Sequence, residues 1–275
     1  MKYGKEWFND ENFWARYAPI MFDDAHWAEV PRVADGVISL VRLNQYLSSR
    51  EEEAGSLPVR GARGGVDGAK GPRLLDLCCG FGRVALEFAR RGFAVTGVDI
   101  TETYLRTAGE DALHEGLDIE FVREDARSFK RPLFFDAAVN LYISFGYFGN
   151  PQDDLVMARN VFESLKPGGA FIIETLGKET AVRDFGRSEW FERAGYTVLV
   201  ESEPADSWAA LKNRWILLKE GERFEKVFTQ RLYAASELRR LLYEAGFSSV
   251  EIYGDWDKSA YDERAEKLIA AGVKG

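Results

Sequence analysis

The 275-residue sequence is short of the features that mark secreted, metal-binding, membrane and nucleic-acid-binding proteins. Its only two cysteines, Cys78 and Cys79, are adjacent, so they cannot form an ordinary disulfide with each other and lack the spacing of metal ligands. No apolar run approaches the ~18 residues of a membrane span. Lys and Arg number 36 against 45 Asp and Glu, and the net charge of −9 gives the surface no general attraction to a phosphate backbone. We therefore expect a cytoplasmic protein without membrane or nucleic-acid partners.

The composition divides the chain into three regions. Residues 1–50 are rich in aromatic side chains and predict helices. Residues 51–72 are first charged and then studded with glycine, which predicts a flexible linker. Residues 73–275 predict one main domain, long enough to bury a core without disulfides. The helix signals in the first region are Asn9 or Asp10 as a first cap, Pro19 as its stop, Asp23-Asp24 as a second cap, and Pro31 as the opening of a third helix.

From Arg73 onward, apolar strands alternate with helical stretches. The predicted strands cover residues 73–78, 94–99, 118–122, 134–140 and 170–175, and the predicted helices cover residues 82–91, 102–115 and 152–165. Such alternation predicts an α/β fold with a mostly parallel sheet and helices on both faces.

The pattern changes after Thr175. Alternating strands at 196–201, 208–218 and 224–232 have no helices between them, which predicts an antiparallel insertion at about 190–233. A helix capped by Ser236 then runs to Ala245. Two last strands, at 250–253 and 267–273, bring the predicted main sheet to seven strands.

The run Leu74–Arg83 ends an apolar strand in an acid, Asp76, and then makes a glycine turn. Gly80 and Gly82 allow the backbone to approach a ligand closely. Residues 80–85 match the pattern GxGxxA, which in dinucleotide enzymes carries a pyrophosphate at a helix N-terminus. Asp76 would repel that anion and suits an ammonium group instead. The alternative is that Asp76 only hydrogen-bonds the backbone of the turn.

Two further acids follow the next two strands. Asp99 ends the second strand, where a carboxylate can accept both ribose hydroxyls. Asp125 follows the third strand, where its carboxylate and the backbone N–H of Ala126 can read an adenine; the alternative is that Asp125 caps a turn. Together with Asp76, these acids lie along the crevice where open α/β sheets bind ligands.

These residues resemble the class I S-adenosylmethionine-dependent methyltransferases over Arg73–Gly275. The resemblance rests on the motifs LDLCCGFG at 75–82, VDI at 98–100, EDA at 124–126, FDAAVN at 135–140 and LKPGG at 165–169. It implies a doubly wound, Rossmann-like sheet of seven strands, with an N-terminal helical lid and the antiparallel insertion before the last helix. It also implies S-adenosylmethionine as cofactor.

The resemblance further implies roles for individual residues. Asp76 and the backbone of Cys78 and Gly80 hold the methionine end, with Gly82 in the same turn. Asp99 holds the ribose, with Ile100 in its motif, and Asp125 and Ala126 hold the adenine. Asn140 lies in the pocket beside the sulfonium, and Tyr17 is a further candidate cofactor-binding residue near it. The family usually has glycine where Cys78 stands, so the closest backbone approach to the cofactor is altered there. Tyr17 with Trp14 and Phe145 can form an aromatic wall, although packing between the lid and the main domain explains them equally well.

The segment Asn140–Phe148 is similar to a loop of small-molecule methyltransferases that act on amino sugars and hydroxylated natural products. Several of these have histidine where Tyr147 stands, so Tyr147 and His26 are candidate bases, with Glu174 as a third. Alternatively, positioning and desolvation supply the catalysis without a dedicated base. The candidate acceptor pocket comprises Tyr142, Phe145, Arg231, Tyr233 and Trp256. Arg231 offers a fork to an anionic acceptor group, or pairs with a neighbouring glutamate.

The favoured hypothesis is methyl transfer from S-adenosylmethionine to an oxygen or nitrogen atom of a small molecule, by a monomer or homodimer without a metal. One alternative is an NAD-dependent dehydrogenase, which the GxGxxA pattern favours and Asp76 opposes. The other is a non-catalytic protein that binds S-adenosylmethionine or another nucleoside.

Overall fold

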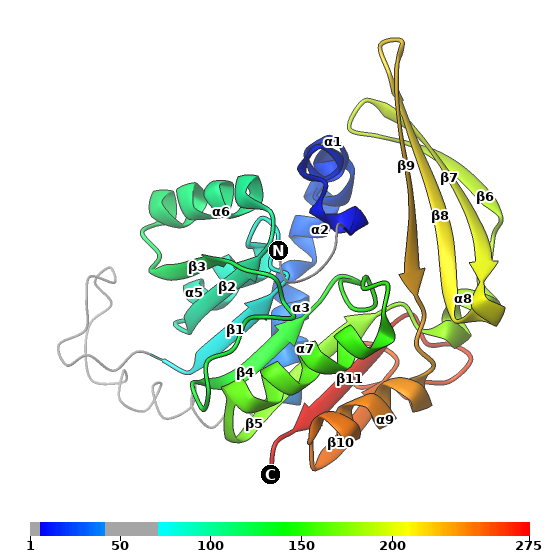
Figure 1. Cartoon of the computed structure of the whole chain (residues 1–275). Helices are drawn as coiled ribbons and strands as arrows, with labels where there is room; N and C mark the ends of the chain where they lie inside the picture. Colours follow the sequence, from blue (N-terminus) through cyan, green and yellow to red (C-terminus); the bar gives the residue numbers. More distant parts are fainter. Residues whose placement is uncertain (1–5, 42–70) are drawn as a thin grey trace.

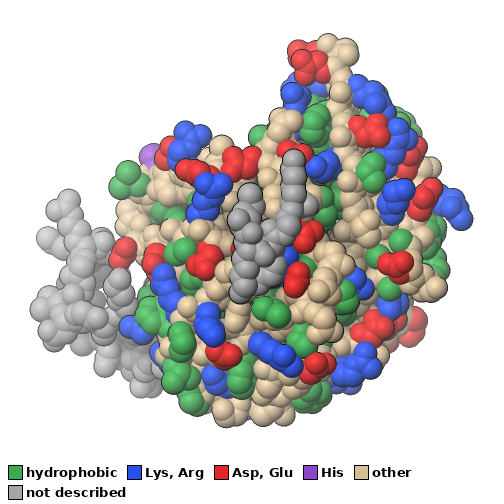
Figure 2. Space-filling model, in the orientation of Figure 1, with side chains coloured by type: hydrophobic (Ala, Val, Ile, Leu, Met, Phe, Trp, Pro, Cys, Tyr) green, Lys and Arg blue, Asp and Glu red, His purple; other side chains and the backbone are tan. Residues whose placement is uncertain are grey.

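The computed structural model describes residues 6–41 and 71–275 (Figure 1). Nearly all of the predicted linker at 51–72 lies outside these described residues. Within them, the chain forms a central sheet of seven strands and a second sheet of four. No helix in this part of the chain is long and apolar enough to cross a membrane. Acidic and basic side chains are interspersed over the face seen in Figure 2.

The central sheet has the strand order β10-β11-β5-β4-β1-β2-β3. Its strands are β1 (Arg73–Leu77), β2 (Ala94–Asp99), β3 (Ile119–Arg123), β4 (Phe135–Asn140), β5 (Leu165–Thr175), β10 (Ser249–Tyr253) and β11 (Leu268–Val273). Strands β1 to β5 pair in parallel, and β11 runs antiparallel to β5 and β10. β1 and β4 are buried along nearly their whole length, as expected for parallel strands covered on both faces. The predicted mostly parallel sheet is confirmed.

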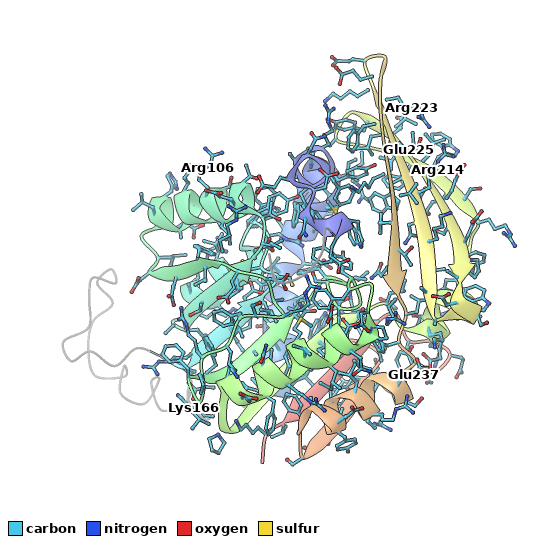
Figure 3. All side chains as sticks on the ribbon, viewed as in Figure 1. Arg106, Lys166, Arg214, Arg223, Glu225 and Glu237 are labelled. Carbon is cyan, nitrogen blue, oxygen red and sulfur yellow. The ribbon has the colours of Figure 1, made fainter. Side chains whose placement is uncertain are left out.

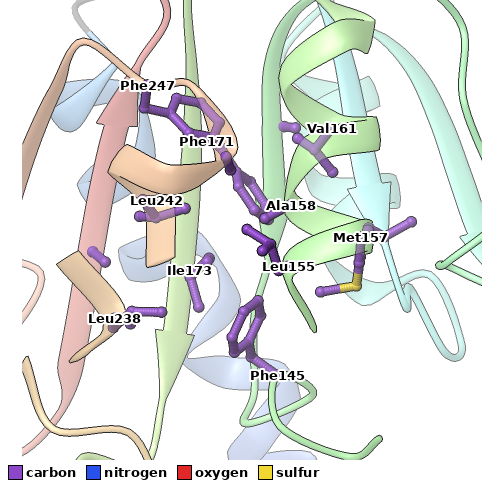
Figure 4. Close-up of a cluster of buried hydrophobic side chains, with 14 of the residues drawn as sticks. Phe145, Leu155, Met157, Ala158, Val161, Phe171, Ile173, Leu238, Leu242 and Phe247 are labelled. Atoms are coloured by element: carbon purple, nitrogen blue, oxygen red, sulfur yellow. The ribbon is translucent and has the colours of Figure 1, made fainter. Parts of the chain in front are cut away.

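Helices cover both faces of this sheet (Figure 1). They are α3 (Val30–Leu40), α5 (Arg83–Arg90), α6 (Glu102–Glu115), α7 (Pro151–Ser164) and α9 (Ala235–Ala245). On one face, side chains of α7 and α9 pack against β5 in a cluster that includes Leu155, Val161, Phe171, Ile173, Leu238 and Leu242 (Figure 4). On the other face, α3 and α5 bury Val33, Val37, Val84 and Phe88. Both cores position the C-terminal ends of β1, β2 and β4 at one edge of the sheet.

The N-terminal helices begin where the sequence predicts. They are a short 3₁₀ turn (Trp7–Asn9), α1 (Glu11–Met21), α2 (Asp24–Ala28) and α3. Asp10 caps α1 by accepting the N–H of Phe13, and Asp23 caps α2 by accepting the N–H of His26. Pro31 lies in the first turn of α3.

Pro19 does not end the first helix, and this prediction is wrong. It lies inside α1, which continues to Met21. The next residue, Ile20, is buried against the second sheet, and this packing stabilises the last turn despite the hydrogen bond that proline removes.

The second sheet is an antiparallel meander of β6 (Ser188–Arg193), β7 (Tyr196–Ala205), β8 (Ala210–Lys219) and β9 (Glu222–Arg231). This confirms the antiparallel insertion. Strand β6 was not predicted, because its sequence is largely polar and exposed at the sheet edge. On β8, Arg214 forms cross-strand ion pairs with Glu201 and Glu225, and the Arg214–Glu225 pair can be followed in Figure 3.

Two local predictions around this sheet need correction. The two-turn helix α8 (Lys178–Arg183) was missed. The last helix begins at Ala235, one residue before Ser236, and the carboxylate of Glu237 accepts the N–H of Ala234 in place of a serine cap.

Candidate active site

A cavity of about 600 Å³ lies where the ends of the central strands, the N-terminal helices and the second sheet meet. Most of the residues selected from the sequence line it, namely His26, Asp76, Cys78, Gly80, Asp99, Ile100, Asp125, Ala126, Tyr142, Tyr147 and Glu174. Aromatic residues that were not selected complete the wall, including Trp7, Phe22, Phe191, Trp215 and Phe228. The concave shape and mostly apolar lining, with a few polar groups, are typical of a small-molecule site.

The glycine turn between β1 and α5 is left-handed at three positions. Cys78, Gly80 and Gly82 have φ angles of 63°, 55° and 73°. This conformation costs a cysteine more than a glycine, which is the physical reason that glycine suits position 78. Gly82 does not line the cavity. A Cβ there would lie 3.0 Å from Ala108, so its role is to bring α5 close to α6.

Asp76, at the end of β1, is only 3 % exposed, and its Oδ2 atom has no hydrogen-bond partner among the described residues. Burial, with the nearby charge of Asp99, raises the pKa of Asp76 to about 7. A buried, unpartnered carboxylate oxygen on a cavity wall fits a cationic ligand group that would hydrogen-bond it. The ammonium group of a methyl donor has this chemistry.

Asp99, at the end of β2, is fixed by backbone donors. Its Oδ2 accepts the N–H of Gly80 at 2.9 Å and its Oδ1 accepts the N–H of Thr101 at 2.8 Å. Burial raises its pKa. Each oxygen keeps a second lone pair, so the carboxylate fits a pair of ribose hydroxyls.

Asp125, after β3, is bound by the guanidinium of Arg127 through both oxygens, at 2.9 and 2.7 Å. Arg127 is 1 % exposed and also forms ion pairs with Glu6 and Asp153. The negative charge of Asp125 is thereby balanced, and its carboxylate is held in one orientation in which it can still accept a hydrogen bond from an amino group. Sequence reasoning missed Arg127, although its position two residues after Asp125 is the signal.

Asn140, at the end of β4, does not line the cavity. It is fully buried, and its Nδ2 donates to the backbone carbonyl of Leu77 at 2.9 Å while its Oδ1 has no partner among the described residues. Asn140 therefore joins the ends of β4 and β1, next to the turn at Cys78, and does not reach the cavity in which its place beside the sulfonium is predicted.

The three candidate bases have different surroundings. Tyr147 packs against the rings of Trp7 and Trp14, and burial raises the pKa of its hydroxyl, so the phenol stays protonated near neutral pH. The Nδ1 atom of His26 lies within hydrogen-bond distance of Asp23, which leaves Nε2 free of that contact. Both carboxylate oxygens of Glu174 are engaged by other residues.

Glu174, at the end of β5, is 4 % exposed. Its Oε2 accepts the N–H of Tyr142 at 2.6 Å, and its Oε1 lies 3.5 Å from the Nζ of Lys267. These contacts hold a strained segment in place, because Tyr142 and Ile143 are successive non-glycine residues with φ of 56° and 63°. The hydroxyl of Tyr142 is buried and has no partner in the described residues, so it is available to a ligand.

Besides Gly82 and Asn140, five more selected residues do not line the cavity: Tyr17, Phe145, Arg231, Tyr233 and Trp256. Tyr17 is fully buried and donates to the carbonyl of Trp215, which ties α1 to the second sheet. Trp256 packs against Gly36 in the core between α3 and the central sheet.

Of the other three, Phe145 and Tyr233 are buried and Arg231 is partly exposed, and all three lie at the loop that carries Tyr147. Tyr233 donates to Asp154 of α7 at 2.7 Å and contacts the ring of Phe145. The backbone N–H of Arg231 donates to the carbonyl of Gly146 at 2.8 Å. These contacts hold the loop in place, and none of the three residues lines the cavity in which the acceptor pocket is predicted.

Comparisons with known proteins agree with this geometry. Residues 74–169 match the family model described as a methyltransferase domain. The putative methyltransferase YqeM of Bacillus subtilis is 25 % identical over 208 residues, covering 74 % of this chain and 84 % of its own length.

Solved structures show the same fold. The CcbJ methyltransferase from Streptomyces caelestis has a TM-score of 0.71 at 18 % identity and covers 90 % of both chains. The S-adenosylmethionine-bound amino pentose methyltransferase CalS10 from Micromonospora echinaspora has a TM-score of 0.57 at 18 % identity, covering 85 % of this chain and 90 % of its own. The domain match favours methyl transfer over the dehydrogenase alternative.

Proposed function

We propose that this chain, a methyltransferase that uses S-adenosylmethionine, transfers the methyl group to an oxygen or nitrogen atom of a small molecule bound in the cavity. One observation supports the proposal: a single cavity is lined both by the carboxylates of Asp76 and Asp99 and by aromatic side chains from α1 and the second sheet. Donor and acceptor have to share about 600 Å³, which limits the acceptor to a small molecule.

For the donor end of the cavity, we propose the following roles. Asp76 binds the ammonium group with the backbone of Cys78 and Gly80, Asp99 binds the ribose hydroxyls beside Ile100, and Asp125 with the N–H of Ala126 binds the adenine. The bound donor supplies an electrophilic methyl group on a sulfonium. The unpartnered oxygen of Asp76 and the fixed carboxylate of Asp99 support these roles.

The acceptor end comprises the remaining cavity residues, chiefly His26, Tyr142, Glu174, Trp215 and Phe228. We propose that His26, oriented by Asp23, accepts the proton that leaves the acceptor. Glu174 positions Tyr142, and the aromatic walls exclude water, so proximity and desolvation contribute the rest of the rate enhancement.

The acceptor class is suggested by the structural neighbours. CalS10 is an amino pentose methyltransferase, and its fold resembles this one over 85 % of the chain. We propose an amino sugar or a hydroxylated natural product as acceptor. The proposal that the protein is a monomer or homodimer is checked by light scattering.

The test has two stages. Calorimetry with S-adenosylhomocysteine measures the donor site, and we expect binding that is lost in Asp99→Ala. Incubation with S-adenosylmethionine and a panel of amino sugars and hydroxylated aromatic compounds is then followed by mass spectrometry for the gain of one methyl group. Donor binding without transfer to any member of a broad panel would favour a non-catalytic binding protein.

A further inference from the structure

Arg83 lines the cavity and has an unusual environment for an arginine. It is the first residue of α5, directly after Gly82, and it is only 5 % exposed. Its Nη1 donates to the backbone carbonyl of His26 at 2.7 Å, and its guanidinium lies 4.1 Å from the ring centroid of Tyr142. Within the described residues, no carboxylate forms an ion pair with it.

Burying a guanidinium without an ion-paired carboxylate is unfavourable, because burial removes the hydration of the charge and no ion pair replaces it. Burial lowers the pKa of Arg83, which reflects this cost, while the nearby charges of Glu29, Asp76 and Asp23 act in the opposite direction without forming an ion pair with it. The aromatic rings of Tyr142 and Phe22 offset part of it through cation–π contacts. The remaining donors of the guanidinium fork are left for a ligand.

Asp76 provides the opposite charge on the same turn. Its Oδ2 is buried and unpartnered, and each of the two groups affects the ionisation of the other through space. They are not joined as an ion pair in the described part of the chain. The cavity wall therefore presents one free carboxylate oxygen and one free guanidinium edge, held apart by the backbone of a single turn.

We propose that Arg83 binds the carboxylate of the amino-acid end of the methyl donor while Asp76 binds the ammonium on the same carbon. This inference rests on the proposed function. An α-amino acid carries both charges within a few ångströms, and a guanidinium fork matches the geometry of a carboxylate. The N-terminus of α5, where Arg83 stands, also favours an anion.

The competing interpretation is that Arg83 only tethers α2 through the carbonyl of His26. A tether would stabilise the covered cavity for every ligand at the donor end. A carboxylate-binding residue would act only on ligands that have the carboxylate. Comparing S-adenosylhomocysteine with 5′-methylthioadenosine, which lacks the amino-acid group, separates the two.

The experiment is calorimetric titration of both ligands into wild type, Arg83→Met and Arg83→Lys. We expect Arg83→Met to weaken the binding of S-adenosylhomocysteine by about 10- to 100-fold, which corresponds to the loss of a charge-assisted hydrogen bond. The binding of 5′-methylthioadenosine should weaken by less than about 3-fold. Arg83→Lys keeps the charge but loses the fork, so its loss for S-adenosylhomocysteine is intermediate. The matched control is Arg193→Met, a cavity arginine paired with Asp23, which leaves the ratio of the two affinities unchanged.

Equal weakening of both ligands in Arg83→Met, or no weakening of either, overturns the inference. If Arg83→Met does not fold, the ratio in Arg83→Lys decides in the same way. Failure of wild type to bind S-adenosylhomocysteine contradicts the donor site itself, and is thus distinguishable from a failure at Arg83.

Discussion

At the donor end of the cavity, the carboxylates come from the ends of three parallel strands, and backbone N–H groups bind two of them, Asp99 and Asp125. At the acceptor end, the wall is made of aromatic side chains from the 3₁₀ turn before α1, from α1, and from β8 and β9, which pack on one another, such as Trp7 against Phe228 with ring centroids 4.6 Å apart. The donor end is thus fixed by the main chain, and the acceptor end by side-chain packing. Variants should therefore act at the donor end through affinity for the cofactor, and at the acceptor end through turnover.

The largest expected effect is at Asp99. Asp99→Ala removes the ribose acceptors and leaves the N–H groups of Gly80 and Thr101 without their partner, so we expect S-adenosylhomocysteine to bind about 100- to 1,000-fold more weakly by calorimetry. Asp184→Ala, at the exposed C-terminal end of α8, is the control and should bind S-adenosylhomocysteine as wild type does. A loss below about 5-fold would contradict the role of Asp99.

The second-largest expected effect is a loss of turnover at the acceptor end that leaves the affinity for the cofactor product unchanged. His26→Ala should lower kcat about 100-fold or more, the scale of general-base catalysis, while S-adenosylhomocysteine binds within about 3-fold of wild type. Tyr147→Phe should lower kcat by less than 3-fold, since its protonated phenol is no base at neutral pH. Both are measured with an acceptor found in the panel. Loss of activity in Tyr147→Phe with full activity in His26→Ala would reverse the assignment.

A third prediction concerns pH. Asp76 binds an ammonium group only when ionised, and its pKa in the free protein is about 7. The affinity for S-adenosylhomocysteine should rise as pH increases from 5.5 to 7, by up to about tenfold per unit, and then level off. The variant Asp76→Asn should bind weakly and without this rise. An identical pH profile in the variant would show that another group is responsible.

The raised pKa of Asp76 also determines how the stability of the unligated protein changes with pH. Because the pKa of Asp76 is raised on folding, the native state holds more protons than the unfolded state between about pH 4 and 7, and unligated stability should fall as pH rises through this window. Burial also raises the pKa of Asp154 to about 7, so Asp154 contributes a further decrease in stability as the pH rises through the same window. Thermal denaturation of Asp76→Asn and Asp154→Asn separates the two contributions.

The smallest expected effect is at Cys78. Cys78→Gly relieves a left-handed backbone conformation and should raise the free energy of unfolding by about 1 kcal/mol, measured by chemical denaturation. Cys79→Gly, whose backbone is not left-handed, should not stabilise the protein. Destabilisation by Cys78→Gly would mean that thiol packing outweighs the strain.

The sequence predicted the central sheet, and it predicted that Asp76, Asp99 and Asp125 lie together, because both have local signals. Asp76, Asp99 and Asp125 each follow an apolar strand, and parallel strands bring their ends to one edge. Asn140 and Gly82 belong to the same motifs, but the side chain of Asn140 turns to Leu77 and Gly82 packs on α6, details that a strand pattern does not specify.

The acceptor end was predicted poorly because its residues depend on tertiary packing. Which face of β9 meets the cavity is set by the docking of α1, so Phe228 and Gln230 line it while Arg231 does not. The left-handed pair Tyr142–Ile143 turns Phe145 into the core, and no residue type in that pair signals such a backbone.

The hydrogen bond from Tyr17 to Trp215 has a consequence for the order of folding. It joins residues 198 positions apart, whereas the strand ends at the donor end all lie within residues 76–125. Contacts between distant residues form late because their loop-closure entropy is large. We expect the strands around the glycine turn to gain protection in pulsed hydrogen exchange before α1 does, so that the chain forms its nucleoside site first and encloses the second substrate's chamber last.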